Sequence, residues 1–384
     1  MTAALASALA VPGAPRWSVD WDALRDRFDW VRRMDGTPQD PVHHAEGDVA
    51  IHTRLVCSAM AGLAAFRDLD DDSRLVAFAG ALLHDVAKPD CTRSDDDGRV
   101  TAHGHSVRGA MHARRLLWRL GMPFAMREQV VGLVRHHQAP FWLLERADPH
   151  RLVATISQTV RCDWLALLAE SDARGRTCAD PQRILDNVEL FRAYCEENGC
   201  LSAPFAFPTA HARFLYLGGR QRDALHAPHE DFRCEVVLMA GFPGAGKDRW
   251  IAENLAGWPI VSLDRLRQEL DVDPEDDQGS VVARAREAAR EHLRAGRSFV
   301  WNATNVSRRI RAQCTRIFAD YGARIRIVYV EVPEPTLRAQ NRGRRAPVPE
   351  HVLDSLLEKW EVPDLTEAHE VVYAVRPVEA HRSL

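Results

Sequence analysis

The sequence lacks several features that would assign a class of protein at once. No apolar run approaches the ~20 residues that a membrane-spanning helix needs. The eight cysteines form no C-x-x-C pair, which argues against a zinc ribbon or a disulfide framework and for reduced thiols. The formal net charge of −4 excludes a generally basic chain, so any nucleic-acid site must come from local arginine clusters. What remains is a chain of 384 residues, globular in composition and long enough for two domains.

The first half of the chain is predicted to be helical. Residues 1–16 are Ala-rich but lack the basic segment of a signal peptide, so we expect a disordered tail. Amphipathic patterns predict a helical domain over residues 17–198, with no convincing strand. The expected helical segments are 17–33, 49–67, 73–87, 105–120, 124–138, 150–171 and 181–198. Residues 199–233, rich in Pro, Gly and His, are expected to be a connector.

Residues 234–384 have a different pattern. Short β-branched runs alternate with helical stretches, which is typical of an α/β domain with a mostly parallel sheet. The expected strands are Val236–Ala240, Pro259–Ser262, Ser298–Trp301, Ile325–Val332 and Val371–Val375. The predicted fold class is therefore two domains, an all-α domain followed by an α/β domain.

The dipeptide His84-Asp85 ends an apolar helical pattern, and further histidines and aspartates lie on successive predicted helices. One such histidine is usually a capping or core residue, but a divalent cation needs imidazoles and carboxylates that converge from several elements. The candidate ligands are His52, His84, Asp85, His105, His136, His137 and Asp172, with His43 and His44 less secure. Asp163 rivals Asp172 because both lie on one predicted helix. Lys88, one turn after His84, could hold a phosphate there, although an exposed lysine is equally compatible with the spacing.

This ordered set resembles the HD phosphohydrolase superfamily, whose pattern is H…HD…H…HH…D, over about residues 40–175. The resemblance implies an all-α domain that hydrolyses phosphate esters with one or two divalent metal ions. It implies that the first metal is held by His52, His84, Asp85 and Asp172, and the second by His105 with His136 or His137. Asp172 is preferred to Asp163 because its surroundings are similar to the ending of HD domains in tRNA-processing enzymes.

The second half contains the stretch Gly241-Phe-Pro-Gly-Ala-Gly-Lys247-Asp248 between a predicted strand and a helix. Backbone N–H groups of such a loop, the helix N-terminus and the lysine together favour a polyphosphate. The predicted nucleotide-binding residues in it are Gly241, Gly244, Ala245, Gly246, Lys247 and Asp248. Asp248 stands where a Ser or Thr hydroxyl normally contacts Mg²⁺; a carboxylate can also do so, but it adds negative charge beside a triphosphate.

Three further segments supply polar residues around the predicted phosphate crevice. Asp264 follows the second strand, where a general base would sit, although it could also cap a helix; Arg267 shares its face and could grip a phosphate. Thr304 and Asn305 follow the third strand and face the crevice or cap the next helix. A later basic face is predicted to be a mobile lid or, alternatively, a solvated helix surface. Its arginines are Arg338, Arg342 and Arg345.

These segments together resemble the 5′-hydroxyl polynucleotide kinases over about residues 234–375. The resemblance implies that Lys247 contacts the β- and γ-phosphates, that Asp264 is the general base, and that Arg267 binds a nucleic-acid phosphate. It implies Thr304 and Asn305 as nucleotide-site residues and Arg338 and Arg342 as lid residues. The implied cofactors are ATP or another NTP with Mg²⁺.

The order of the two halves is similar to that of the bacterial HD–Pnk family of nucleic-acid end-healing enzymes. That resemblance implies phosphorylation of 5′-OH ends by the second half and removal of 2′(3′)-phosphate or 2′,3′-cyclic phosphate ends by the first. Expected partners are RNA or DNA ends and a separate ligase, in the cytoplasm and without a membrane. Two alternatives remain open: an HD nucleotide phosphohydrolase with a regulatory P-loop domain, or one with a small-molecule kinase domain.

Overall fold

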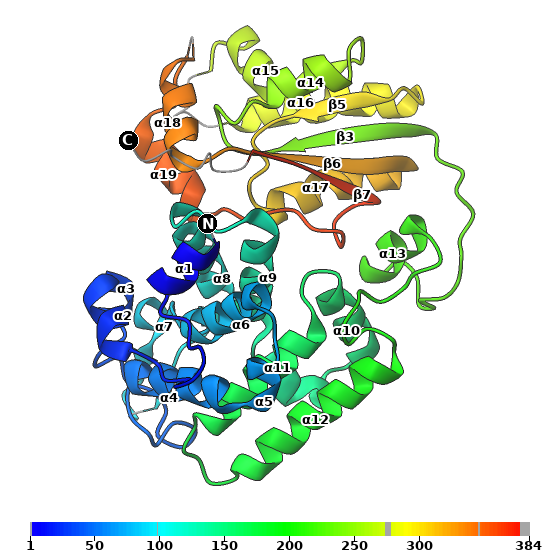
Figure 1. Ribbon diagram of the computed structural model, residues 1–384. Helices are drawn as coiled ribbons and strands as arrows, with labels where there is room; N and C mark the ends of the chain where they lie inside the picture. The colour runs from blue at the N-terminus through cyan, green and yellow to red at the C-terminus, as the bar shows by residue number, and fades with distance from the viewer. Residues whose placement is uncertain (1, 98, 273–277, 345, 377–384) are drawn as a thin grey trace. The chain divides into compact units, whose positions relative to one another are not determined.

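The computed structural model describes residues 2–97, 99–272, 278–344 and 346–376, and these divide into two compact units (Figure 1). The first unit extends to Ala206 and the second begins at Phe207. The expected connector, 199–233, is therefore divided between the units. Phe205 accepts and donates hydrogen bonds with Gln158 and Ser157 in the first unit, while Arg213 donates to the His369 carbonyl at 2.7 Å in the second.

The first unit is helical, as predicted. Within the described residues its helices are α1 (Thr2–Ala8), α2 (Trp21–Arg27), α3 (Asp29–Arg32), α4 (Val49–Gly62), α5 (Ala64–Arg67), α6 (Asp71–Leu83), α7 (Lys88–Cys91), α8 (His105–Arg119), α9 (Phe124–His136), the 3-10 helix η1 (Ala139–Glu145), α10 (Pro149–Ser157), α11 (Cys162–Arg174) and α12 (Pro181–Glu197). A short antiparallel pair, β1 (Arg93–Ser94) and β2 (Val100–Thr101), was not predicted, because two-residue strands leave no alternating pattern.

The prediction of a disordered tail is wrong for residues 2–8, which form α1. Leu5 and Leu9 are buried, and the Arg27 side chain donates hydrogen bonds to the carbonyls of Ser7 and Ala8 at 3.2 and 2.6 Å. Burial of two leucines offsets the entropy lost when the segment is ordered. That compensation depends on a partner surface, which an Ala-rich sequence does not reveal.

Helix α6 places the His84-Asp85 dipeptide in the middle of the first unit. It begins where the Asp70 carboxylate accepts the Ser73 N–H at 2.8 Å, a standard N-cap. Every residue from Leu75 to Leu83 is buried, so the helix is apolar on all sides and packs against α4, α9 and α11. His84 is its C-cap, and Asp85 follows inside the core.

The second unit has a five-stranded sheet with the order β4-β5-β3-β6-β7, and every pairing is parallel (Figure 1). Its strands, β3 (Cys234–Ala240), β4 (Ile260–Ser262), β5 (Phe299–Asn302), β6 (Ala323–Glu331) and β7 (Glu370–Val375), confirm the five predicted ones within two residues at each end. Its helices are α13 (Ala210–Leu217), α14 (Lys247–Asn254), α15 (Leu263–Glu269), α16 (Gly279–Arg294), α17 (Arg308–Asp320), α18 (Glu334–Arg342) and α19 (Glu350–Glu358). Strand β3 is central, so the loop that follows it lies at the switch point where open α/β sheets bind ligands.

Candidate functional site

Six predicted side chains meet inside the first unit, around Asp85. His52 comes from α4, His84 and Asp85 follow α6, His105 begins α8, His137 follows α9, and Asp172 lies on α11. All six are at least 93% buried. They form two groups of possible ligands, His52–His84–Asp172 and Asp85–His105–His137, whose donor atoms lie within 4.8 Å of one another in each group.

The Asp85 carboxylate lies between the two groups. Its Oδ2 is 3.2 Å from the Nε2 of His84 and 3.8 Å from that of His52. Its Oδ1 is 3.4 Å from the Nε2 of His105 and 3.8 Å from that of His137. This Oδ1 is buried and has no hydrogen-bond donor. A buried carboxylate oxygen without a donor is costly, and a cation would compensate it.

The histidines are oriented through their other ring nitrogens. The Nδ1 atoms of His84, His105 and His137 lie 2.7–2.9 Å from the carbonyls of the residues three positions earlier. A carbonyl can only accept, so each Nδ1 carries a proton, and in the neutral ring the lone pair lies on Nε2. The lone pairs are therefore available at the centre, as in metal-binding histidines.

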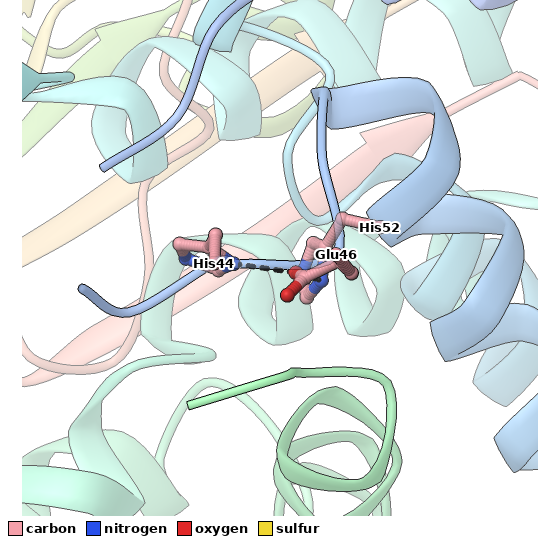
Figure 2. A group of neighbouring side chains, drawn as sticks. All are labelled: His44, Glu46 and His52. Carbon is pink, nitrogen blue, oxygen red and sulfur yellow. Dashed lines mark hydrogen bonds and ion pairs between the residues drawn. The ribbon is translucent and has the colours of Figure 1, made fainter. Parts of the chain in front are cut away.

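His52 has no such carbonyl contact and instead lies beside Glu46, a residue that the sequence did not indicate. Figure 2 shows the Glu46 carboxylate beside the rings of His44 and His52. Its Oε1 lies 2.8 Å from the Nδ1 of His52 and 2.9 Å from that of His44, and its Oε2 accepts the Thr177 N–H at 2.8 Å. No spacing rule links a turn residue to a helix six positions later, so only the fold identifies this carboxylate.

The protonation states suit a cation. Burial opposes ionisation of Asp85, but positive charge on His84 and Lys88 holds the pKa of Asp85 well below its usual range. Burial also opposes a charge on His84, but Asp85 raises the pKa of His84, so a metal ion at this nitrogen would displace a proton. Burial likewise opposes the ionisation of Asp172, whose pKa is lowered by Arg176 and His52. Burial lowers the pKa of His137 to about 3, so this imidazole is neutral at pH 7. Ionised carboxylates and neutral imidazoles are the forms that bind divalent metal ions.

The structure distinguishes between the alternatives in the sequence. His137 is in the cluster, whereas His136 is outside both groups. Asp172 is in the cluster, whereas Asp163 pairs with Arg161, with Oδ2 and Nη2 2.5 Å apart. His44 lies beside the cluster through Glu46 rather than in the two groups around Asp85.

A cleft of about 510 Å³ lies over this cluster, within the first unit. Lys88, Arg176, His44 and His105 are among its lining residues. Lys88 is buried, and its Nζ lies 2.7 Å from Asp85 Oδ2 and donates to Gln39 Oε1 at 2.6 Å, so it is not a solvated surface lysine. Arg176 donates two hydrogen bonds to Asp172, both 2.8 Å long. The positively charged side chains of Lys88 and Arg176 therefore lie where an anionic ligand in the cleft would contact the cluster.

In the second unit, the glycine-rich loop joins β3 to α14. Gly241 has φ +142°, and a Cβ there would lie 2.4 Å from the Val330 carbonyl oxygen, so only glycine fits. Gly244 and Gly246 also have positive φ angles, and Ala245 donates its N–H to the Phe242 carbonyl. The resulting turn brings the backbone to the N-terminus of α14, the arrangement that binds phosphate.

The Lys247 ammonium lies beneath this loop and donates to the carbonyls of Gly241 and Phe242, both at 2.9 Å. Burial of the ammonium lowers its pKa to about 8, although nearby Asp264 and Asp248 oppose the shift. An anionic phosphate would replace neutral carbonyl partners with a stronger charge-assisted one.

Asp248 is exposed, and its Oδ1 accepts a 2.6 Å hydrogen bond from Asn302, the last residue of β5. Polar residues were predicted after this strand, but Asn302 had no predicted role. The bond fixes one carboxylate oxygen, and the arrangement can offer the carboxylate to a magnesium ion or to its water shell.

Asp264 is in contact with two arginines. Its Oδ1 accepts from Arg267 at 2.6 Å and its Oδ2 from Arg344 at 3.2 Å. Partial burial opposes ionisation, but these bonds and the charges of Arg267, Arg344 and Lys247 lower the pKa of Asp264. The carboxylate is therefore ionised at neutral pH, as a proton acceptor must be.

Two arginines of the expected lid are paired with carboxylates. Arg338 donates to Glu334, Glu350 and Asp354, and Arg342 donates to Glu350, so both join α18 to α19. The arginine that reaches Asp264 is Arg344, which the helical spacing did not indicate because it follows the end of α18. Arg345 lies outside the described residues.

Thr304 and Asn305 support the loop through the protein's own contacts. The Thr304 carbonyl accepts the Gly241 N–H at 2.9 Å. Asn305 is buried, has φ +45°, and its side-chain amide donates to the Met239 carbonyl at 2.7 Å. The structure therefore gives Asn305 a role in shaping the end of β3 rather than an open position for a nucleotide.

Comparison with known proteins gives matches in both units of the chain. Residues 49–159 match the family model of the HD domain, and residues 236–363 match that of an AAA domain. The Multifunctional CCA protein of Thioalkalivibrio sulfidiphilus is 31% identical over 163 residues, covering 41% of this chain and 37% of that protein. That of Halorhodospira halophila is 34% identical over 115 residues, covering 30% and 25%. A gluconokinase structure from Sinorhizobium meliloti is 22% identical, covers 38% of this chain and 85% of that one, and has a TM-score of 0.27.

The chain thus spans well under half of the length of these two curated relatives. Among the residues that the structure describes, no helix has the length and apolar character needed to span a bilayer. Over the matched residues the chain therefore has a helical HD domain followed by a P-loop domain with a five-stranded parallel sheet.

Proposed function

We propose that this chain is a bifunctional end-healing enzyme of the HD–Pnk type. Its P-loop domain transfers phosphate from ATP or another NTP to a 5′-OH end of RNA or DNA. Its HD domain removes a 2′(3′)-phosphate or a 2′,3′-cyclic phosphate end. The two products have the polarity that a ligase needs, so a separate ligase is the expected partner, and the cytoplasm is the expected compartment. The HD match and the two curated relatives are compatible with this proposal.

The observation that carries the phosphatase half is the position of Asp85 between two sets of histidines beneath a cationic cleft. His52, His84 and Asp172 would hold one divalent ion, and His105 with His137 a second, with one oxygen of Asp85 toward each. When bound, such ions would supply Lewis acidity to the phosphate group and favour attack by water on phosphorus. Lys88 and Arg176 would bind the non-bridging phosphate oxygens and hold the ester in place.

The kinase half rests on the contacts of Lys247 and Asp264. Lys247 would leave the loop carbonyls and bind the β- and γ-phosphates of the donor. Asp264 would accept the proton of the attacking 5′-hydroxyl, and Arg267 would bind the adjacent nucleic-acid phosphate. Arg344, already 3.2 Å from Asp264, would approach the same crevice and offset negative charge during transfer. Asp248, oriented by Asn302, would bind Mg²⁺ or its water shell.

The direct test uses the purified full chain. Incubation with γ-labelled ATP and a 5′-OH oligonucleotide should label the oligonucleotide, and incubation with an oligonucleotide ending in a 2′-phosphate should release inorganic phosphate. Each assay is run with Mg²⁺, Mn²⁺, Co²⁺ and Ni²⁺. Labelling of small hydroxyl compounds but never of oligonucleotides would instead support a small-molecule kinase.

Replacing Glu46 with glutamine is expected to weaken binding of Mn²⁺ to the HD domain by about 10–100-fold, the usual effect of losing a carboxylate behind a histidine ligand. The substitution keeps the size of the side chain but removes the charge 2.8 Å from His52 Nδ1. Calorimetric titration of the full chain measures the affinity. Glu170→Gln, which changes a carboxylate paired with Arg174, is the matched control. Equal affinity in Glu46→Gln and the parent would contradict this role.

Replacing Asp248 with alanine is expected to raise the Mg²⁺ concentration needed for half-maximal kinase rate by about tenfold, because one oxygen ligand or water anchor is lost. Asp248→Ser, which supplies the usual hydroxyl, should recover most of the loss. Glu253→Ala, on the same helix, serves as control because this carboxylate pairs with Arg249. The measurement is initial rate against Mg²⁺ at fixed NTP, and an unchanged Mg²⁺ dependence in Asp248→Ala would remove Asp248 from the metal site.

A further inference from the structure

Two large aromatic side chains that the chemistry above does not use line the cleft over the Asp85 cluster, Phe141 and Trp142, and of these two only Trp142 is exposed. Trp142, in η1, lines the cleft and is 40% exposed. Its neighbours Phe141 and Leu143 are almost completely buried. We propose that Trp142 is a stacking platform for the base of the terminal nucleotide whose phosphate reaches the Asp85 cluster. This inference rests on the proposed phosphatase function and assigns its substrate-recognition site.

The backbone around Trp142 is held in place. Its φ of −129° and ψ of 18° interrupt η1, so the chain kinks at this residue. The carbonyl of the preceding Phe141 accepts a 3.0 Å hydrogen bond from the Asn187 side chain on α12. The Phe141 ring lies 4.8 Å from the Arg176 guanidinium. The indole therefore stands on an anchored segment, and the same segment contacts a cation at the inner end of the cleft.

The charges of the cleft match a phosphorylated strand end. Lys88 and Arg176 lie at the inner end against Asp85 and Asp172, while exposed Arg99 and Arg183 line the cleft elsewhere. Two carboxylates that line the cleft accept hydrogen bonds from backbone N–H groups: Asp40 from Val42, and Asp180 from Arg183.

The size also fits. About 510 Å³ lies within the range of small-molecule sites and can hold a nucleotide. A cationic inner end, an aromatic wall and arginines elsewhere in the lining are the parts from which single-stranded nucleic-acid sites are built. A bare phosphate or a small alkyl phosphate would use the inner end alone. The geometry therefore points to a nucleotide, and to stacking that tolerates any of the four bases.

The test combines a protein change with a substrate change. The substrates are two oligonucleotides with the same terminal 2′-phosphate, one with a base on its last nucleotide and one abasic there. Trp142→Ala should raise the KM for the complete end about tenfold, the scale of losing one base–aromatic stack. Removing the base should raise the KM of the parent protein similarly. On the abasic end, Trp142→Ala should then raise the KM little further.

Two further variants separate stacking from structure. Trp142→Phe should retain most of the affinity, because it keeps an aromatic face. Leu144→Ala is the matched control, since Leu144 is 58% exposed in the same segment and is not among the residues lining the cleft. Hydrolysis of glycerol 2-phosphate should be unchanged by Trp142→Ala. An equal rise in KM on complete and abasic ends, or no rise on either, would overturn the stacking role.

A binding measurement distinguishes failure of this inference from failure of the proposed function. Calorimetry compares a nucleoside 2′-monophosphate with glycerol 2-phosphate, in the parent and in Trp142→Ala. The parent should prefer the nucleotide about tenfold and the variant should lose that preference. If the preference is present but no oligonucleotide end is hydrolysed, the end-healing proposal fails while the stacking site stands. If ends are hydrolysed but the preference is the same in both proteins, the stacking site fails alone.

Discussion

Replacing Asp85 with alanine is expected to lower phosphate release from a 2′-phosphate end by at least about 10³-fold, corresponding to roughly 4 kcal/mol of transition-state stabilisation. The carboxylate has one oxygen toward each set of histidines, so its loss removes a ligand from both candidate metal positions at once. It also leaves the buried Lys88 ammonium without its partner at 2.7 Å. Kinase activity of the same protein should remain within about twofold, because the P-loop site has its own residues.

The Asp85 experiment needs a control for folding, because a buried charge cluster is disturbed. Asp85→Asn keeps the shape and should show the same loss of phosphatase with a smaller change in melting temperature. Circular dichroism follows the helical unit, and calorimetric titration with Mn²⁺ reports whether the metal is lost. Phosphatase activity that survives in a folded Asp85→Asn protein would show that Asp85 is not at the reacting centre.

Replacing Lys247 with alanine is expected to lower kinase activity and to leave phosphatase activity intact, the reverse of the result for Asp85→Ala. The kinase rate on 5′-OH oligonucleotides should fall about 10²–10³-fold, the scale for removing one oriented positive group from a site where charge develops. Phosphate release by the HD domain should be unchanged. The two readouts are labelled oligonucleotide and inorganic phosphate, measured on one preparation.

The matched control for Lys247 is Arg249→Ala. Arg249 lies two residues along on the same helix and pairs with Glu253 at the surface, so its loss tests for an unspecific effect of removing a cation from α14. Loss of both activities from either Asp85→Ala or Lys247→Ala would contradict separate active sites. It would favour instead a chain in which one domain regulates the other.

The parts of the chain that could be predicted from sequence are those whose signal is local. The glycine-rich loop is contiguous, and each of its residues has a conformational or chemical reason that does not depend on distant neighbours. The five strands could be predicted because they are short β-branched runs. The runs in β3, β5 and most of β6 are buried, as is usual in parallel sheets, whereas the edge strands β4 and β7 are only partly buried. The His84-Asp85 dipeptide was recognisable because it follows an uninterrupted buried stretch of α6, Leu75–Leu83.

The parts that could not be predicted depend on contacts between segments far apart in the chain. Adjacent His136 and His137 differ only in the direction that the end of α9 gives them, and His137 is the one that reaches His105, with Nε2 atoms 3.3 Å apart. The direction that α11 gives to its side chains likewise decides that Asp172, and not Asp163, lies in the cluster. Asn302 and Arg344 have contacts with Asp248 and Asp264 that span 54 and 80 residues.

By itself, therefore, the sequence determined an HD-like helical half, a P-loop half and most of the residues that could carry chemistry. Only the tertiary structure decided which of them meet. It brought Glu46 to His52, assigned Asn305 to the support of β3, engaged Arg338 with three carboxylates, and ordered α1 against a surface elsewhere in the first unit. The physical reason is that chemical type and local conformation depend on residues close together in the sequence. Burial, helix phase and long-range pairing depend instead on the packing of whole elements.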